Sequence, residues 1–263
     1  MVAENIYNDA FYDLQSKESY ESALVILALL RRKLGEKIQL DSIIDFGCGV
    51  GSWLAAAKEV GFKHVCGTDG EYVPKDRLMI EQDEFLPNDL SVPSRVNIPG
   101  EKFDLAMSLE VAEHLPEEVA SDFVAKLTST SDIVLFSAAI PYQGGHGHVN
   151  ENWLEYWAKL FRERGFVPVD MLRADIWYDS RVCWWYKQNC MLFVTRDALG
   201  LLPANTLVNP ILSVIHPEQF LVSEHRNDSH KNYSLGADKW YFRQLSSEHP
   251  IKARPYGNEH AIR

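Results

Sequence analysis

Apolar side chains recur along this chain at two spacings, and these predict where its helices and strands lie. Between Tyr20 and Leu34 they recur every three or four positions, which predicts a helix that basic residues and Gly35 would end. Short apolar runs bounded by turn residues predict strands instead, and the first of these ends at Phe46. Four further strands are expected at residues 63–68, 103–109, 133–139 and 190–195.

Helical patterns separate these strands. Residues 52–60 and 117–128 show helical spacing, as does an apolar stripe at 153–161 that Asn150 would cap and Gly165 would end. Strands that alternate with helices predict an α/β fold with a doubly wound sheet, largely parallel and covered on both faces.

The pattern also predicts three parts of the chain. Residues 1–40 would form an N-terminal helical addition, residues 41–198 the core, and residues 199–263 a C-terminal extension. Within the extension, residues 226–263 are polar with scattered aromatic side chains, which predicts a peripheral tail.

Composition narrows the class of protein. The chain has 263 residues, 46% hydrophobic and 24% charged, as in a folded soluble domain. Its 26 basic and 37 acidic side chains give a net charge of -11, which disfavours nucleic acid as a partner. The four cysteines lack Cys-x-x-Cys spacing, and the longest apolar run, residues 23–30, is too short to cross a bilayer. A cytoplasmic protein without membrane insertion is expected, and an oligomer is left open.

A glycine-rich turn follows the first strand and predicts a nucleotide-type site. The turn reads D-x-G-x-G-x-G from Asp45 to Gly51, and a helical segment begins at once. Two ligand classes compete for such a turn, dinucleotides and S-adenosyl-L-methionine. The dinucleotide pattern G-x-G-x-x-G would need glycine at Ser52. An acid at the strand end suits a ligand with an ammonium group, which favours an amino-acid-bearing nucleoside.

Further acids follow where such a nucleoside would need them. Asp69 ends the second strand, where its carboxylate can accept hydrogen bonds from two ribose hydroxyls. Asp89 could accept one from an adenine amino group. The strand at 103–109 then leads into Glu110 and the segment Glu113-His114-Leu115-Pro116.

In this order, the motifs resemble those of the class I S-adenosyl-L-methionine-dependent methyltransferases, over residues 43–195. The resemblance implies a Rossmann-like sheet of seven strands, the last of them, 190–195, antiparallel. It implies S-adenosyl-L-methionine as cofactor and S-adenosyl-L-homocysteine as product. It also implies which residues bind the cofactor. The methionine part would be contacted by Asp45, Gly47, Gly49 and Gly51, the ribose by Asp69, and the adenine by Asp89 and Leu90, while Glu110 would lie beside the ligand.

The segment 139–153 is expected to bind the methyl acceptor. It leaves its strand at the edge that carries the glycine turn, so it should overhang the donor's methyl group. A hydroxyl acceptor needs a group to remove its proton, and a neutral histidine suits that role near pH 7. The candidates, in order, are His148, His146 and His114. Alternatively, His148 holds the loop backbone beneath the Asn150 cap.

The pattern Gly-Gly-x-Gly-His-Val-Asn-Glu-x-Trp at 144–153 is similar to that of a bacterial methyltransferase subgroup associated with polysaccharide and glycan biosynthesis. This resemblance implies O-methylation of a sugar hydroxyl, with the sugar nucleotide-linked or part of a glycan precursor. Expected substrate contacts are Tyr142, Gln143, Asn150, Trp153 and Arg181. Arg181 could instead form a salt bridge with Asp179 or Asp175, which the sequence favours.

Other functions stay open at this point. An N-methyltransferase of an amino sugar or small amine would need little help from a histidine base. A protein that only binds S-adenosyl-L-methionine or S-adenosyl-L-homocysteine would need none. No metal is expected, because Mg²⁺ prefers oxygen ligands, the loop offers only Glu151, and the lone His146-x-His148 pair is weak evidence for zinc.

Overall fold

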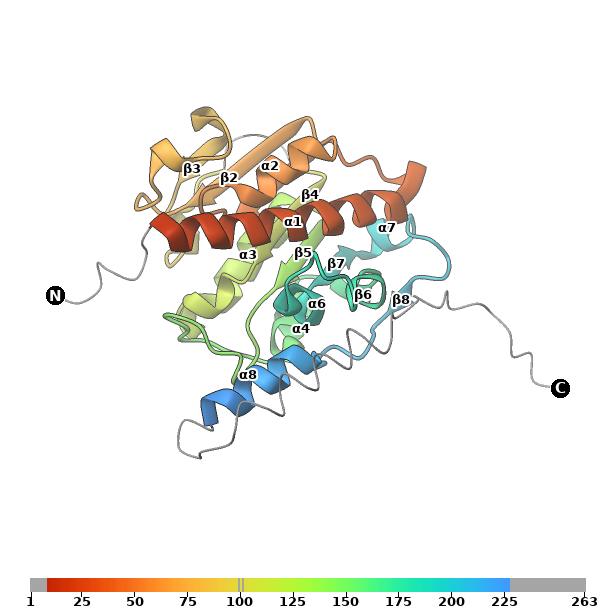
Figure 1. The fold of residues 1–263 in the computed structure, drawn as a ribbon. Helices are drawn as coiled ribbons and strands as arrows, with labels where there is room; N and C mark the ends of the chain where they lie inside the picture. Colours follow the sequence, from red (N-terminus) through yellow and green to blue (C-terminus); the bar gives the residue numbers. More distant parts are fainter. Residues whose placement is uncertain (1–8, 99, 101, 228–263) are drawn as a thin grey trace. The chain divides into compact units, whose positions relative to one another are not determined.

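The structure, a computed structural model, describes residues 9–227 except 99 and 101 (Figure 1). The described residues up to Phe220 form one compact unit, and Leu221 begins a second. Of the second unit only the end of helix α8 is described, so most of the predicted tail lies outside the described residues. No helix within these limits is both long and apolar enough to cross a membrane.

An eight-stranded sheet forms the centre of the first unit, in the order β3-β2-β1-β4-β5-β7-β6-β8. Strands β1 to β5 are parallel to their neighbours, β7 is antiparallel to β5 and β6, and β8 is antiparallel to β6. The strands are β1 Ser42–Phe46, β2 His64–Asp69, β3 Phe85–Pro87, β4 Leu105–Leu109, β5 Ile133–Ser137, β6 Phe166–Asp170, β7 Met191–Thr195 and β8 Leu207–Val208. The chain order reverses on either side of β1, and ligands of open α/β sheets bind at the carboxyl end of such a strand.

Helices connect and cover the strands. The α-helices are α1 Asp9–Leu34, α2 Ser52–Glu59, α3 Ala120–Thr130, α4 Leu154–Glu163, α5 Arg173–Ile176, α6 Trp184–Asn189, α7 Arg196–Leu199 and α8 Pro217–Asn227. Short 3₁₀ turns are η1 Gly35–Lys37, η2 Lys75–Arg77, η3 Gln82–Glu84, η4 Pro93–Arg95, η5 Ala112–His114 and η6 Glu117–Val119.

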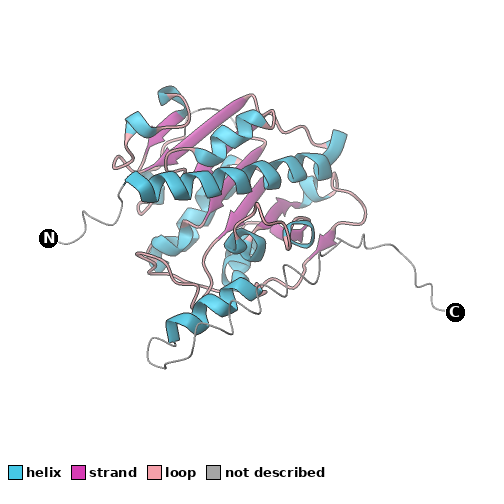
Figure 2. Cartoon of the chain, viewed as in Figure 1, coloured by secondary structure: helices cyan, strands magenta, loops and turns pink. Residues whose placement is uncertain are grey.

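Two apolar cores lie on opposite faces of the sheet. Successive strand residues alternate between them, so Ile43 belongs to the core with α1 and α2, while Ile44 belongs to the core with α3 and α4. Both residues are fully buried. Figure 2 shows α1 crossing in front of the strands on the first of these faces. The sheet covered on both faces, predicted from the sequence, is therefore confirmed.

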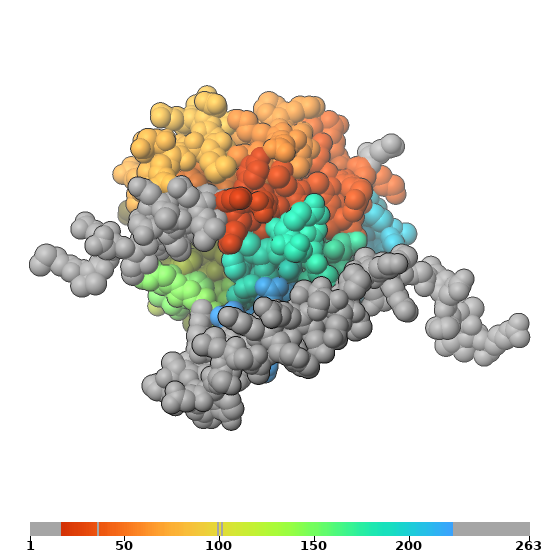
Figure 3. Space-filling model, in the orientation of Figure 1, coloured from red at the N-terminus to blue at the C-terminus, as the bar shows by residue number. Residues whose placement is uncertain are grey.

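Helix α1 packs against α2 and also contacts the segment just before α6, on the same face of the sheet. Its buried residues Ile26, Leu27 and Leu30 pack in the core that α2 shares. Near its middle, Ser22 Oγ accepts a hydrogen bond of 3.0 Å from the backbone N–H of Cys183, just before α6. Figure 3 shows α1 (red) between the orange surface of α2 and the green-blue surface around α6. The N-terminal helix therefore packs directly on the core.

The predicted elements are mostly confirmed, with two corrections. The strands at 63–68, 103–109, 133–139 and 190–195 all form within two residues of the expected bounds, and β7 is antiparallel as predicted. The sheet has eight strands rather than seven, because the two-residue β8 adds an edge strand next to β6. Asn150 does not cap α4, since that helix begins at Leu154 with Trp153 as its N-cap residue.

Candidate functional site

The glycine turn between β1 and α2 leaves open space at one position. Gly47, Gly49 and Gly51 all have positive φ angles, of 86°, 52° and 85°. A Cβ atom at Gly47 would lie 2.3 Å from the side chain of Val111, so this glycine is needed for packing. A Cβ at Gly49 would meet no atom within 4 Å, which leaves room for a ligand against the main chain.

Two carboxylates lie beside this turn at the ends of β1 and β2. Asp69 Oδ2 accepts a hydrogen bond of 2.8 Å from the Gly49 N–H, and its Oδ1 accepts one of 2.7 Å from Gly70 N–H. Asp45 is buried, and burial, followed by the nearby Asp69 charge, raises the pKa of its carboxyl well above the usual value. An ammonium group of a ligand would offset both effects. The pair therefore fits the predicted amino-acid-bearing nucleoside.

The predicted adenine residues lie beyond β3. Asp89 is exposed, and its Oδ1 accepts hydrogen bonds from the backbone N–H of Ser91 at 2.9 Å and from the Ser91 hydroxyl. These bonds lower the pKa of the Asp89 carboxyl. Leu90 is buried in the core of α3 and α4.

Glu110 lies at the end of β4 in a buried network of amides. Its backbone has a φ of 57°, unusual for a residue other than glycine. Its carboxylate accepts hydrogen bonds from Gln143 Nε2 at 2.6 Å and from Asn189 Nδ2 at 3.2 Å. Burial raises the pKa of Glu110 although these amides and Ser137 lower it.

This network includes residues that the sequence analysis missed. Asn189 Nδ2 also donates to Gln143 Oε1 at 2.8 Å, and Gln188 Oε1 accepts a bond of 2.8 Å from the backbone N–H of His216. The expected substrate residue Gln143 is thus buried and bound to Glu110 and Asn189. A signal for the network was present, because the two adjacent amides of Gln188 and Asn189 interrupt an apolar stretch immediately before β7.

Glu151 organises the predicted acceptor loop. Its carboxylate accepts hydrogen bonds from the backbone N–H of Tyr142 at 3.0 Å, from that of Gly144 at 2.9 Å, and from His148 Nδ1 at 2.8 Å. The His148 ring is therefore held by a carboxylate and does not hold the Asn150 backbone. With Nδ1 donating to Glu151, Nε2 is the ring atom that faces other groups.

His148 meets the turn η5 at a cluster of three side chains. The rings of His114 and His148 lie edge to face with centroids 4.7 Å apart. Glu113 is completely buried, and neither of its carboxylate oxygens has a hydrogen-bond partner among the described residues. Burial and the Glu110 charge raise the pKa of Glu113 well above its usual value, more than the nearby backbone amides of Glu113 and Ala139 lower it. Burial likewise lowers the pKa of His114, which keeps its ring neutral.

The cluster lies next to the glycine turn. Val111, whose side chain fills the space at Gly47, immediately precedes η5. Backbone N–H groups of Val149 and Asn150 donate to the carbonyl of Glu113 at 2.9 and 3.0 Å. The structure thus brings His114 and His148 together beside the expected donor site.

The remaining predicted residues are not members of this three-residue cluster. His146 is exposed, Tyr142 is 83% exposed and Trp153 is 41% exposed. Asn150 is buried, and its Oδ1 accepts a hydrogen bond from Asn152 Nδ2 at 2.6 Å. Arg181 forms the predicted ion pair with Asp179 at 2.6 Å. The other possible partner, Asp175, pairs with Lys33 instead.

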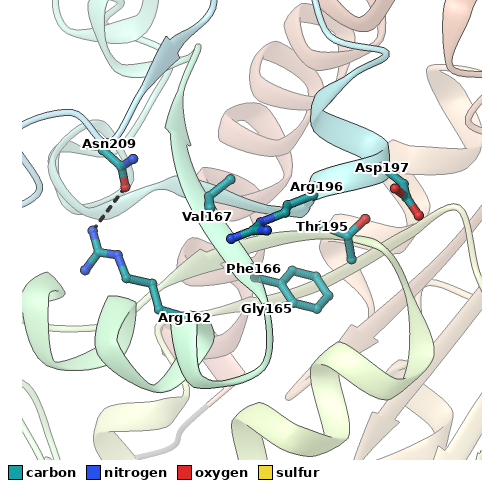
Figure 4. Close-up of a pocket in the computed structure, with 8 residues that line it drawn as sticks. All are labelled: Arg162, Gly165, Phe166, Val167, Thr195, Arg196, Asp197 and Asn209. Atoms are coloured by element: carbon teal, nitrogen blue, oxygen red, sulfur yellow. Dashed lines mark hydrogen bonds between the residues drawn. The ribbon is translucent and has the colours of Figure 1, made fainter.

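A separate surface pocket lies at the end of the strands opposite to the glycine turn (Figure 4). It is found where β6 begins and β7 ends, while the glycine turn follows the carboxyl end of β1. The lining residues are Arg162, Gly165, Phe166, Val167, Thr195, Arg196, Asp197 and Asn209. None of them is a predicted site residue, and Arg162 donates a hydrogen bond of 3.3 Å to Asn209 Oδ1.

Comparison with known proteins identifies the domain. Residues 17–137 match the family model of a methyltransferase domain. No curated protein matches the chain in sequence. These matched residues run from α1 to the end of β5 and include the glycine turn, Asp69 and Glu110.

Solved structures of similar fold are distant in sequence. The magnesium protoporphyrin IX methyltransferase of Synechocystis PCC 6803 is 21% identical over 72% of this chain and 84% of its own, with a TM-score of 0.48. An O-methyltransferase family protein of Burkholderia thailandensis is 14% identical over 71% of this chain and 58% of its own, with a TM-score of 0.49. An SAM-dependent methyltransferase of Archaeoglobus fulgidus is 20% identical over 60% and 76%, with a TM-score of 0.44. Sequence identities and TM-scores as low as these give no information about the methyl acceptor.

The match and the sheet order with its antiparallel β7 agree. The chain carries a methyltransferase domain in the Rossmann-like fold of the class I S-adenosyl-L-methionine-dependent methyltransferases, and the protein is therefore an enzyme.

Proposed function

We propose that this enzyme O-methylates a hydroxyl group of a sugar. The observation that carries the proposal is the ring of His148, held by Glu151 and placed at the edge of the sheet where the glycine turn lies. A histidine held through Nδ1 presents Nε2 to an acceptor, as a base near neutral pH must.

The donor side fits the residues at the turn. Asp45 and Gly49 would hold the methionine part of S-adenosyl-L-methionine and Asp69 its ribose, with Asp89 and Leu90 near the adenine. When bound, the cofactor supplies an electrophilic methyl group. Glu110, kept in place by Gln143 and Asn189, would line the space between donor and acceptor.

The acceptor side fits an uncharged sugar. Tyr142 and Trp153 are exposed aromatic side chains on the loop, and their flat faces can pack against a sugar ring. The acceptor's O–H bond would break as its proton passes to Nε2 of His148, which leaves the oxygen free to take the methyl group. The loop aligns the hydroxyl, and alignment is the largest task in a displacement at carbon.

The first test is mass spectrometry of nucleotide-linked sugars and amino sugars after incubation with the enzyme and S-adenosyl-L-methionine. One added methyl on a neutral sugar supports the proposal. A methyl on the nitrogen of an amino sugar contradicts it in favour of N-methylation. Methylation confined to acceptors that are not sugars contradicts it as well.

The second test separates the two sides of the site. His148→Ala should keep the donor's Kd and lower turnover by about 100-fold or more, the usual size of acid–base catalysis. Asp69→Ala should instead raise the donor's Kd by about tenfold or more, because it removes a charged hydrogen-bond acceptor. Calorimetry measures the donor's Kd, and the rate of product formation measures turnover. Unchanged turnover in His148→Ala would remove that residue from the proposal.

A further inference from the structure

Glu113 is a buried carboxylate that the methyl-transfer proposal leaves without a role. Its side chain is 0% exposed, and both oxygens lack a hydrogen-bond partner among the described residues. A buried acid in this condition is costly unless something positive or a proton compensates it. No Lys or Arg side chain of the described residues is paired with it.

Two imidazoles lie beside that carboxylate. One ligand atom each from Glu113, His114 and His148 can be chosen so that all three lie within 4.8 Å of one another. Tetrahedral bonds of about 2.1 Å to a single ion place two ligand atoms about 3.4 Å apart, so binding would draw the three atoms together by at most about 1.4 Å. The glycines at 144, 145 and 147 give the loop that carries His148 the freedom to make it.

We propose that Glu113, His114 and His148 bind one divalent transition-metal ion, with zinc and manganese the best-suited candidates. Two imidazole nitrogens and one carboxylate oxygen favour such an ion over Mg²⁺, which prefers oxygen ligands. Three protein ligands also leave a coordination position open, as in catalytic rather than structural zinc sites.

The surroundings of the ligands support this assignment. Glu151 accepts a hydrogen bond from Nδ1 of His148, and a metal-binding histidine usually donates its second nitrogen to a carboxylate. The bonds from Val149 and Asn150 to the Glu113 carbonyl join the two ligand-bearing segments. Glu110 stays outside the set, because Gln143 and Asn189 already bind its carboxylate.

The proposal differs from the expectation drawn from sequence. The sequence suggested possible ligands on one loop only, namely His146, His148 and Glu151. In the fold His146 is exposed, and Glu151 binds the backbone and His148. The carboxylate that faces the histidines is Glu113, from a different segment of the chain.

The inference rests on the proposed function in one respect. The open position would receive the acceptor's hydroxyl, and a bound cation lowers the pKa of such a group. In the ion-loaded enzyme the hydroxyl's O–H bond would break with loss of the proton to water, because Nε2 of His148 would be bound to the ion. The role of His148 as base, proposed above, then belongs to the ion-free enzyme.

Metal binding is tested directly, without turnover. Purified enzyme is stripped with a chelator, dialysed and titrated with Zn²⁺ or Mn²⁺ in a calorimeter, and its metal content is measured by mass spectrometry. We expect one ion per chain, and at least tenfold weaker binding in Glu113→Gln and in His148→Gln. His64→Gln, an exposed histidine at the start of β2, is the matched control and should bind normally.

Because Glu113→Gln and His148→Gln are both measured, the test still gives a result if one of them misfolds. Glu113 is buried, whereas His148 lies on a loop, so at least the second should retain the donor's Kd and the melting temperature. No binding by the wild type, or equal binding by a folded His148→Gln, overturns the metal site. Turnover that survives chelation overturns only the role of the ion in activation. Normal ion and donor binding with no methylated sugar overturns the proposed function and leaves the site in place.

Discussion

At Gly145 the absence of a side chain makes room for the ring of His148. An ideal Cβ at this position would lie 2.1 Å from Nε2 of that ring and 2.3 Å from its Cε1. No real contact is that short, so any larger residue must displace the imidazole. The glycine thus contributes to the site by setting where Nε2 lies.

Gly145→Ala should therefore lower turnover by about tenfold or more while leaving the donor's Kd unchanged, because small misplacements of reacting groups are costly. Gly200→Ala is the control, since its added methyl would meet only ordinary contacts at 3.4 Å. Steady-state kinetics and donor titration check both variants. Normal turnover in Gly145→Ala would show that the ring can move without loss.

Asp45 makes stability depend on pH. Burial raises the pKa of this carboxyl in the folded state well above its unfolded value, so the folded state keeps a proton that the unfolded state has released. The free energy of unfolding of the donor-free enzyme should therefore fall as pH rises from about 4 through the raised pKa of the folded state. Above that pKa the loss is complete.

Asp45→Asn should remove this contribution. We expect the donor-free variant to be more stable than the wild type near neutral pH, with a smaller change between acidic and neutral pH. Because an ammonium ligand would lose its partner, donor binding should weaken by about tenfold. Denaturant unfolding at several pH values, with donor titration, measures both effects. If the free energy of unfolding of the variant changes with pH as much as that of the wild type, a group other than Asp45 is responsible for the pH dependence.

At the scale of elements, helix α5 attaches the segment 207–216 to the sheet. Arg173 is buried and pairs with Asp170 at 2.8 Å. Its guanidinium also donates to the carbonyls of Leu212 at 2.6 Å and of Ile211 at 2.5 Å. Together with β8 and the bond from His216 to Gln188, this ties residues 207–216 to the core.

Arg173→Met should lower the free energy of unfolding by about 3–5 kcal/mol, because it leaves the largely buried Asp170 without its partner. The double variant Asp170→Asn with Arg173→Met should lose less. Arg181→Met breaks an exposed pair and should cost less than about 1 kcal/mol. Urea unfolding compares the three. Equal losses at Arg173 and Arg181 would contradict the role of burial.

At the scale of the whole molecule, net charge governs the choice of partner. A net charge of -11 repels a phosphate backbone. Gel mobility assays at low salt should therefore show no shift of RNA or DNA, and neither should be methylated. A retarded band that disappears as salt is added would contradict this prediction and direct the search for acceptors to nucleic acids.

Much of the fold could be predicted because its signals are local. The strand of residues 190–195 and the helix ended by Gly165 are readable from apolar spacing and from one residue able to adopt positive φ. The short strand β8 was not readable, because two exposed residues form it only where β6 offers a free edge. Asn150 failed as a cap because the chain stays extended through Trp153 before α4 begins.

The sequence by itself determined the glycine turn, the carboxylates at the ends of β1 and β2, and the histidines of the proposed acceptor loop, since each depends on neighbours in the chain. Only the tertiary structure decided which of those histidines meet. The sheet places the end of β4 beside the end of β5, and this brings Glu113 and His114 to His148 and Glu110 to Asn189. Hydrogen bonds and metal coordination act over a few ångströms of space, so distance along the chain could not reveal them.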